Sequence, residues 1–225
     1  MSKKYSYIGI AFIILLFGIY TVPKVVNRFA DTGLVYLKTS DVLAEKRKVP
    51  EFSFTDQEGK TITNNSYLGK VYVVEFFFTT CPSICPIMTN KMLLLQDTFF
   101  GNPEFGIVSI SITPEIDTPD TLKEYAKNKG ITHKNWHLLT GRTEDFVYDI
   151  AKRGFSLYAG KGDEAHGGFE HSGYFALVDK EGYLRSRKDG NGNPLIYYNA
   201  IEDNGFPDQI TELKEDIKLL LNEEY

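Results

Sequence analysis

The chain has 225 residues, of which 25 are basic and 30 acidic, a net charge of −5, and 42% hydrophobic and 14% aromatic residues. This length and hydrophobic content support one sizeable core, which favours a single globular domain over two enzymatic domains. The balanced charge argues against disorder, and the absence of a broad basic region argues against nucleic-acid binding. The sequence contains no internal repeat and no low-complexity tract.

The N-terminus is more apolar than the rest of the chain. Tyr5 to Val22 is a run of 18 residues without a charge, and as a helix it would extend about 27 Å, close to one bilayer core. No small-residue cleavage pattern follows Val22, so we interpret the run as an uncleaved anchor rather than a removed signal peptide. No transit-peptide composition precedes it, which favours a bacterial origin. We therefore expect residues 1–22 to form one transmembrane helix.

Residues 23–49 are expected to link this anchor to the domain. The segment has scattered basic residues and one short apolar cluster, Leu34 to Leu37. The alternative is an N-terminal extension that packs partly on the domain. Regular patterns begin after the segment, so we expect residues 50–225 to form the folded part.

Apolar periodicity predicts an alternation of strands and helices in the domain. The run 71–78 is almost continuously apolar, as in a central strand buried on both faces. The helix after Asp117-Thr118-Pro119 begins with a capping residue and Pro at its first position, and Gly130 ends it. The predicted elements are a hairpin over 52–63, a strand over 71–78, a helix containing 88–95, a strand over 105–112, a helix over 119–130, a strand over 136–139, a helix over 143–153 stopped by Gly154, a hairpin over 174–186 and a helix over 210–221. This order predicts an α/β fold with a mixed sheet and helices on both faces.

The two cysteines lie together in Thr80-Cys81-Pro82-Ser83-Ile84-Cys85-Pro86, between the predicted central strand and the following helix. A strand-to-helix junction lies at the carboxyl edge of the sheet, where open α/β folds place their sites. A helix N-terminus stabilises thiolate over thiol, so we expect both sulfurs to be more acidic than free cysteine. At positions i and i+4 the two side chains share a face and can bind one metal ion or form a disulfide. A permanent structural disulfide is the alternative, although it would close only a short loop.

Two thiolates alone leave a metal ion under-coordinated, and the chain has four histidines. His137 lies in a strand-like run and is interpreted as structural, whereas His133 and His166 lie in polar loops and are expected to be exposed. His171 ends a Gly-rich loop directly before the predicted strand over 174–178, so it is either a ligand or an exposed loop residue. Two thiolates and one imidazole suit copper, with zinc as the main competitor.

Several other residues have simpler explanations than metal binding. Met88 and Met92 recur at helical spacing and are interpreted as helix core. Glu115, Asp117 and Asp120 precede or begin a predicted helix, where the helix dipole favours acidic residues, and we interpret them as capping.

With these motifs, the sequence resembles the Sco/SenC family of thioredoxin-like copper proteins that help assemble cytochrome c oxidase. The resemblance spans roughly 50–190, and the segments that support it are Phe76-Phe77-Phe78-Thr79-Thr80-Cys81-Pro82-Ser83-Ile84-Cys85-Pro86 with Met88, Asp117-Thr118-Pro119 with Leu122 and Tyr125, Leu139-Thr140-Gly141, and His171-Ser172 leading into Leu177-Val178-Asp179-Lys180-Glu181-Gly182.

The resemblance implies a thioredoxin-like fold and a copper ion bound by Cys81, Cys85 and His171. It also implies one N-terminal membrane helix, with the domain on the periplasmic or extracytoplasmic side of a bacterial inner membrane. The chain departs from the family pattern at Thr113, where the family often has Asp, in the charged stretch 185–190, and in 191–207, which has no counterpart that we can match. These departures bear on partner recognition rather than on the metal site.

The leading interpretation is a metallochaperone that delivers copper to the copper-bearing subunit of cytochrome c oxidase or to another acceptor. The alternative is a thiol-disulfide oxidoreductase acting on cysteines of that subunit or of another exported protein, since both activities require thiolates. His171 discriminates between them, because metal binding needs it and thiol exchange does not. A peroxidase is disfavoured, since Cys85 is too close to Cys81 to be a typical resolving cysteine.

Overall fold

The computed structural model describes residues 11–22, 33–38, 46–162, 168–202, 205 and 207–223. The chain divides into two compact units, one over 1–33 together with 224–225 and one over 34–223. The described part of the first unit contains a helix over residues 11–22. Across the described ranges, no helix has both the length and the apolar character needed to span a bilayer. Residues 1–10 of the predicted span lie outside these ranges, so the transmembrane helix stays a prediction.

The second unit is an α/β domain. Its helices are α2 (Cys85–Thr98), α3 (Pro119–Lys129), α4 (Glu144–Asp149) and α5 (Ile210–Asn222), with a short 3-10 helix η1 (Asn64–Tyr67) and a π-helical segment η2 (Ile150–Phe155). Its strands are β1 (Leu34–Tyr36), β2 (Ser53–Asp56), β3 (Thr61–Thr63), β4 (Val71–Phe77), β5 (Phe105–Ser111), β6 (Trp136–Thr140), β7 (Ala159–Lys161), β8 (Phe169–His171), β9 (Tyr174–Val178), β10 (Leu184–Arg187) and β11 (Tyr198–Asn199).

One mixed sheet organises the domain. Its strand order is β1-β10-β9-β4-β5-β6-β2-β3, and β11 pairs with β9 beside this path. The central strands β4, β5 and β6 are parallel, and the outer pairings are antiparallel. Strands β7 and β8 form a separate two-stranded hairpin. This is the mixed α/β, thioredoxin-like arrangement that the sequence predicts.

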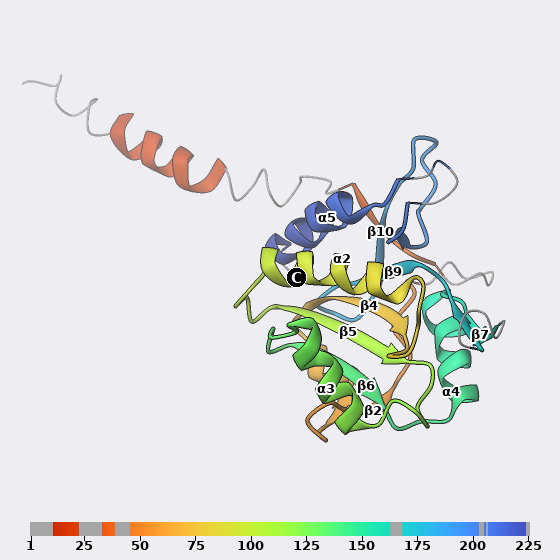
Figure 1. The fold of residues 1–225 in the computed structure, drawn as a ribbon. Helices are drawn as coiled ribbons and strands as arrows, with labels where there is room; N and C mark the ends of the chain where they lie inside the picture. The colour runs from red at the N-terminus through yellow and green to blue at the C-terminus, as the bar shows by residue number, and fades with distance from the viewer. Residues whose placement is uncertain are drawn as a thin grey trace, which may run out of the picture. The chain divides into compact units, whose positions relative to one another are not determined.

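Helices cover both faces of the sheet. Successive side chains of a strand point to opposite faces, and in β4 the ring of Phe77 contacts Tyr125 of α3 at 5.6 Å, whereas the ring of Phe76 contacts Phe155 of η2 at 5.9 Å. Helices α2, α3 and α5 lie on the first face, and the α4 segment lies on the other (Figure 1). Every residue of β4 is buried, which confirms the predicted central strand.

The predicted helix after Asp117 is confirmed in detail as α3. The side chain of Thr118 accepts a hydrogen bond from the backbone N–H of Thr121, Pro119 occupies the first turn, and Gly130 ends the helix at φ 76°. A positive φ is a conformation that glycine adopts without steric cost. These local signals fix the position of the loop between β5 and α3, which faces the cysteines.

Two sequence-based boundaries need correction. Leu34 to Tyr36, placed in the linker, forms β1 and pairs with β10, because the apolar cluster is buried when it completes the sheet edge. The predicted stop at Gly154 is also wrong, since the helix continues as η2 and turns at Ser156, with φ 57°. Position 154 requires glycine for a different reason: a Cβ there would lie only 2.7 Å from Cγ of Pro50, so a larger side chain would clash.

Candidate metal centre

The two cysteines lie where β4 passes into α2, at the carboxyl edge of the parallel strands. Residues 79–84, the cysteine loop, connect these elements, and α2 begins at Cys85 with Pro86 in its first turn. Proline has no backbone N–H and a fixed φ, both suited to a helix start. The loop thus presents Cys81 just outside the helix and Cys85 just inside it.

Cys81 is the more acidic of the two thiols. It is 8% exposed, and its sulfur lies 3.5 Å from the backbone nitrogen of Cys85, which donates to it, and 3.8 Å from the hydroxyl of Ser83. The Cys85 side chain is the largest of the contributions that lower the pKa of Cys81 to about 3; His171 and backbone N–H groups lower it further, and burial opposes them. Cys81 is therefore the thiolate of the pair.

Cys85 does not follow the sequence expectation. Burial raises the pKa of this thiol far above its ordinary value, and the neighbouring Cys81 sulfur raises it further. The expectation of two acidic thiols is thus wrong for Cys85, because it is 2% exposed and desolvation outweighs the favourable helix N-terminus. A second thiolate beside the first would add like-charge repulsion.

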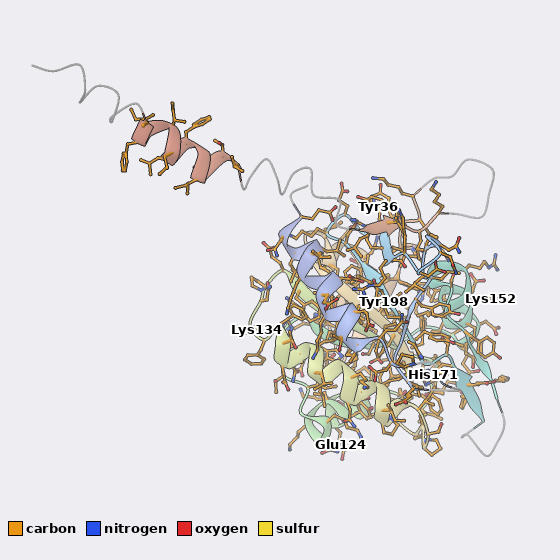
Figure 2. The ribbon with its side chains drawn as sticks, turned by 90° about the horizontal axis from the view of Figure 1, so that it is seen from above. Tyr36, Glu124, Lys134, Lys152, His171 and Tyr198 are labelled. Carbon is orange, nitrogen blue, oxygen red and sulfur yellow. The ribbon has the colours of Figure 1, made fainter. Side chains whose placement is uncertain are left out.

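His171 is brought to the cysteines by the hairpin β7–β8. The residue ends β8 opposite Ala159 and is 4% exposed; Figure 2 shows it beside the hairpin strands, within the packed side chains. Its Nδ1 faces the carbonyl oxygen of Ser172 at 3.2 Å, which fixes the proton on Nδ1, and its Nε2 lies 2.8 Å from Sγ of Cys85. The Nε2 lone pair therefore points at the sulfur, where it can accept the Cys85 S–H or bind a metal ion.

Aromatic packing holds the imidazole in this orientation. The ring of Phe78, the residue directly after β4, contacts His171 edge to face at 5.8 Å and Phe169 at 5.8 Å. Directly beside the hairpin strands, the backbone N–H of Ser172 donates to the carbonyl oxygen of Tyr158 at 2.9 Å, and the backbone N–H of Tyr158 donates to the hydroxyl of Ser172 at 3.2 Å. The histidine is thus positioned by the core side chain that also precedes the cysteine loop.

The structure brings together the three residues that the sequence singled out. One ligand atom each from Cys81, Cys85 and His171 lies within 4.8 Å of the others, and all three residues are buried. Two sulfurs and one imidazole nitrogen at this spacing fit a soft metal ion such as copper, and the same two sulfurs are close enough for thiol-disulfide chemistry. We call these three residues the Cys–Cys–His cluster.

A buried glutamate contributes to the electrostatics of the cluster. Glu75 of β4 is 2% exposed; one carboxyl oxygen accepts from Ser109 at 2.7 Å, and the other has no hydrogen-bond partner in the described structure. Burial raises the pKa of Glu75 to about 7, and its charge raises the pKa of Cys85. No pattern in the sequence indicates this role, since one glutamate in an apolar run does not reveal its partners.

The remaining histidines have different outcomes. His137 is structural as expected, with Nδ1 2.9 Å from Asp56. His133 is not exposed: it is 5% accessible, and its Nε2 lies 3.2 Å from the carbonyl oxygen of Phe99, because the β5 and α2 ends enclose its loop. His166 lies outside the described residues.

Of the methionines interpreted as helix core and the acidic residues interpreted as helix caps, Asp117 does not have the predicted role. Met88 and Met92 are fully buried in the core of α2, as expected. Asp120 lies in the first turn of α3, but Asp117 is 0% exposed and accepts four hydrogen bonds, so it is a buried anchor rather than a cap. One of those donors is Thr113, the position at which the chain departs from the family pattern.

Comparison with known proteins finds a matching family model and similar proteins. The SCO1/SenC family model matches residues 40–204. The SCO1 protein homolog of Bacillus subtilis is 33% identical over 168 residues, which cover 74% of this chain and 81% of the relative.

Two solved structures extend the comparison. BsSco, described as having a disulfide switch and as a member of the Sco family of cytochrome c oxidase assembly proteins, has a TM-score of 0.65 and 28% identity, covering 84% of this chain and 100% of that one. Arabidopsis thaliana ScoI, solved with copper bound, has a TM-score of 0.55 and 25% identity, covering 76% of this chain and 96% of that one.

Proposed function

The chain belongs to the SCO1/SenC family, and from this premise we propose that it binds one copper ion through Cys81, Cys85 and His171 and delivers it to an acceptor protein. The observation that supports this most strongly is the convergence of two sulfurs and one imidazole nitrogen within 4.8 Å. Soft sulfur ligands favour Cu(I), and a buried site protects the ion from water.

The proposed acceptor is the copper-bearing subunit of cytochrome c oxidase, or another exported copper protein. Support comes from the relatives: ScoI of Arabidopsis thaliana was solved with copper bound, and BsSco is described as belonging to a family of oxidase assembly proteins. Copper is here the cargo, so the site must release the ion as well as hold it. Three protein ligands leave room for an incoming ligand of the acceptor.

A second activity is favoured by the unequal acidity of the two thiols. Thiol-disulfide exchange needs one thiolate that attacks and one thiol held in reserve, and the low pKa of Cys81 beside the raised pKa of Cys85 meets this condition. A reductase of cysteines in the acceptor is therefore the alternative function. His171 is required for the first activity only.

We further propose that residues 1–22 anchor the protein in a bacterial inner membrane, that the linker lies between residue 22 and β1, and that the domain, which begins at β1, lies on the periplasmic or extracytoplasmic side. The uncharged run Tyr5 to Val22 supports the anchor, and its described part is a helix with exposed apolar side chains such as Phe12 and Phe17. An oxidase copper site on the outer face of the membrane would be within reach of such a domain.

Anaerobic titration with Cu(I) and a competing chelator tests the copper function. We expect one equivalent to bind to the reduced full chain in detergent. His171→Ala removes a ligand and should weaken binding by more than the 10- to 100-fold cost typical of a residue that only supports a ligand. Cys81→Ser and Cys85→Ser should abolish binding, because a hydroxyl is a poor ligand for soft copper.

His133→Ala is the matched control, since His133 is equally buried but lies outside the cluster. Its copper affinity should equal that of the wild type. If His171→Ala also equals wild type while a cysteine variant loses binding, His171 is not a ligand and the oxidoreductase function takes first place.

A further inference from the structure

A buried carboxylate, Asp117, ties the cysteine loop to the rest of the fold. Its Oδ1 accepts from the hydroxyl of Thr79, and its Oδ2 accepts from the backbone N–H of Thr79 at 3.2 Å, the hydroxyl of Ser111 at 2.6 Å and the hydroxyl of Thr113 at 3.0 Å. All four partners donate, which matches a carboxylate that only accepts. Asp117 is 0% exposed, so water does not replace a lost partner.

The four hydrogen bonds connect three separate segments. Ser111 ends β5, Thr113 and Asp117 belong to the loop before α3, and Thr79 begins the cysteine loop two residues before Cys81. The loop before α3 is itself rigid, since backbone N–H groups of residues 116 and 117 donate to the carbonyl oxygen of Thr113 at 3.0 and 2.9 Å. Asp117 therefore fastens the start of the cysteine loop to a fixed support.

In the described structure, the other hydrogen bonds of the cysteine loop join residues that are close in sequence. The backbone N–H of Cys81 donates to the carbonyl oxygen of Phe78 at 3.3 Å, and that of Cys85 donates to the Cys81 sulfur at 3.5 Å. Both contacts are local and join residues of the same segment. The two bonds from Thr79 to Asp117 are the ones that reach across 38 positions in sequence.

We propose that Asp117 is a positioning residue, acting through Thr79 to hold Cys81 where its sulfur meets Cys85 and His171. Asp117 touches none of the three ligand atoms in the described hydrogen-bond network, so its effect is on the geometry of the loop. Copper binding and disulfide formation are both more favourable when the two sulfurs are already held close together, because less conformational entropy is then lost in either process. The copper part of this inference rests on the proposed function, and the disulfide part does not.

A matched pair of threonine variants tests the inference. Thr79→Val and Thr113→Val each remove one hydroxyl donor to the same carboxylate and keep the side-chain shape, but only Thr79 belongs to the cysteine loop. Two readouts are measured on the full chain in detergent: Cu(I) affinity by chelator competition, and the equilibrium of the Cys81–Cys85 disulfide against glutathione without metal. Asp117→Ala and Asp117→Asn complete the set.

We expect Asp117→Ala to lower Cu(I) affinity by about 10- to 100-fold and to make the disulfide less favourable. Thr79→Val should change both readouts in the same direction, and Thr113→Val should leave both close to wild type. Asp117→Asn should recover most of the loss, since its amide can turn toward the Thr79 hydroxyl, which can accept, while its oxygen keeps the other three donors.

Equal effects of Thr79→Val and Thr113→Val, or wild-type values for Asp117→Ala, would overturn the inference, because the network would then act only on general stability. Failure of the proposed function is distinguishable. If the wild type binds no copper, the disulfide equilibrium still decides whether Asp117 positions Cys81.

Discussion

At the residue scale, the two thiols of the Cys–Cys–His cluster differ in acidity, because the core encloses Cys85 and raises its pKa, whereas the pKa of Cys81 is lowered. The spacing of Cys81 and Cys85 at a strand-to-helix junction was enough to predict a thiol site, because the geometry of that junction is general. The difference between the two thiols was not predictable. It depends on which sulfur the folded core encloses, and the residues that enclose Cys85 come from distant segments.

This difference predicts selective alkylation. The pKa of Cys81 is lowered to about 3, so its thiolate is fully formed above about pH 5 and its reaction with iodoacetamide should not change between pH 5 and 8. Free cysteine would react roughly tenfold faster for each pH unit in this range. The raised pKa of Cys85 should leave it unmodified. Peptide mass spectrometry of the reduced, metal-free protein assigns the site.

Cys85→Ala removes the largest contribution to the low pKa of Cys81, so the pH profile of Cys81 should shift upward. His133→Ala, outside the cluster, should leave the profile unchanged. A wild-type rate that rises steadily toward pH 8.5 would show that Cys81 is an ordinary thiol.

At the element scale, long apolar or periodic segments were predicted and short ones were missed. The strand β4 can be recognised in the sequence because its residues are almost continuously apolar, and in the structure all seven of them are buried. Strands β1, β7 and β11 have only two or three residues each, and their stability comes from partner strands rather than from their own pattern. The charged stretch 185–190 and the segment 191–207, which has no counterpart in the family pattern, have a structural role through their contacts with α5.

That role is an ion-pair network between β10, β11 and α5. Asp216 of α5 is 1% exposed and accepts from Arg187 at 2.7 and 2.8 Å and from the hydroxyl of Tyr198 at 2.6 Å. Tyr198 lies beside α5 in the packed domain (Figure 2). Arg185 and Arg187, the two arginines of the stretch, thus form ion pairs within the domain, and Arg187 fixes the last helix to the sheet.

Asp216→Ala should therefore destabilise the domain by about 3 kcal/mol, because it leaves a largely buried arginine and a buried hydroxyl without their acceptor. Glu215→Ala is the matched control. Glu215 binds the same Arg187 at 3.2 Å but is 60% exposed, so its loss should cost less than about 1 kcal/mol. Urea unfolding of the metal-free protein measures both. Similar losses for the two variants would contradict a buried network.

At the scale of the whole molecule, the chain combines a folded domain with an apolar N-terminal run. The mixed sheet with helices on both faces could be predicted from the order of the elements, because connection rules leave few arrangements for such an order. Its thioredoxin-like identity came from the resemblance to the Sco/SenC family. The function of the run could be predicted only from hydropathy. It therefore calls for its own measurement.

We predict that residues 1–22 remain on the mature protein and hold it in the membrane. The intact mass of the membrane-extracted chain should include these residues, and the protein should resist extraction by alkaline carbonate. Arginine at positions 14 and 15, as Ile14→Arg with Leu15→Arg, should release it, since each charge costs about 2.5 to 3.5 kcal/mol at the centre of a membrane helix.

Phe100→Arg places the same charge on an apolar side chain of the domain that is 66% exposed, and this control should stay in the membrane fraction. An N-terminus near residue 25 in the wild type would show that the run is a cleaved signal.

Cys85 and His171 of the Cys–Cys–His cluster are 86 positions apart in sequence, so the ribosome adds the two cysteines to the chain well before the histidine. During synthesis at about 5 to 20 residues per second, both thiols exist for several seconds before the ribosome has made the imidazole. In that interval the chain has a reactive dithiol and no complete metal site. Under the proposed function, a copper ion held by all three ligands requires that β4, α2 and the β7–β8 hairpin have already packed together, so the chain binds copper through the complete site only after these segments have folded.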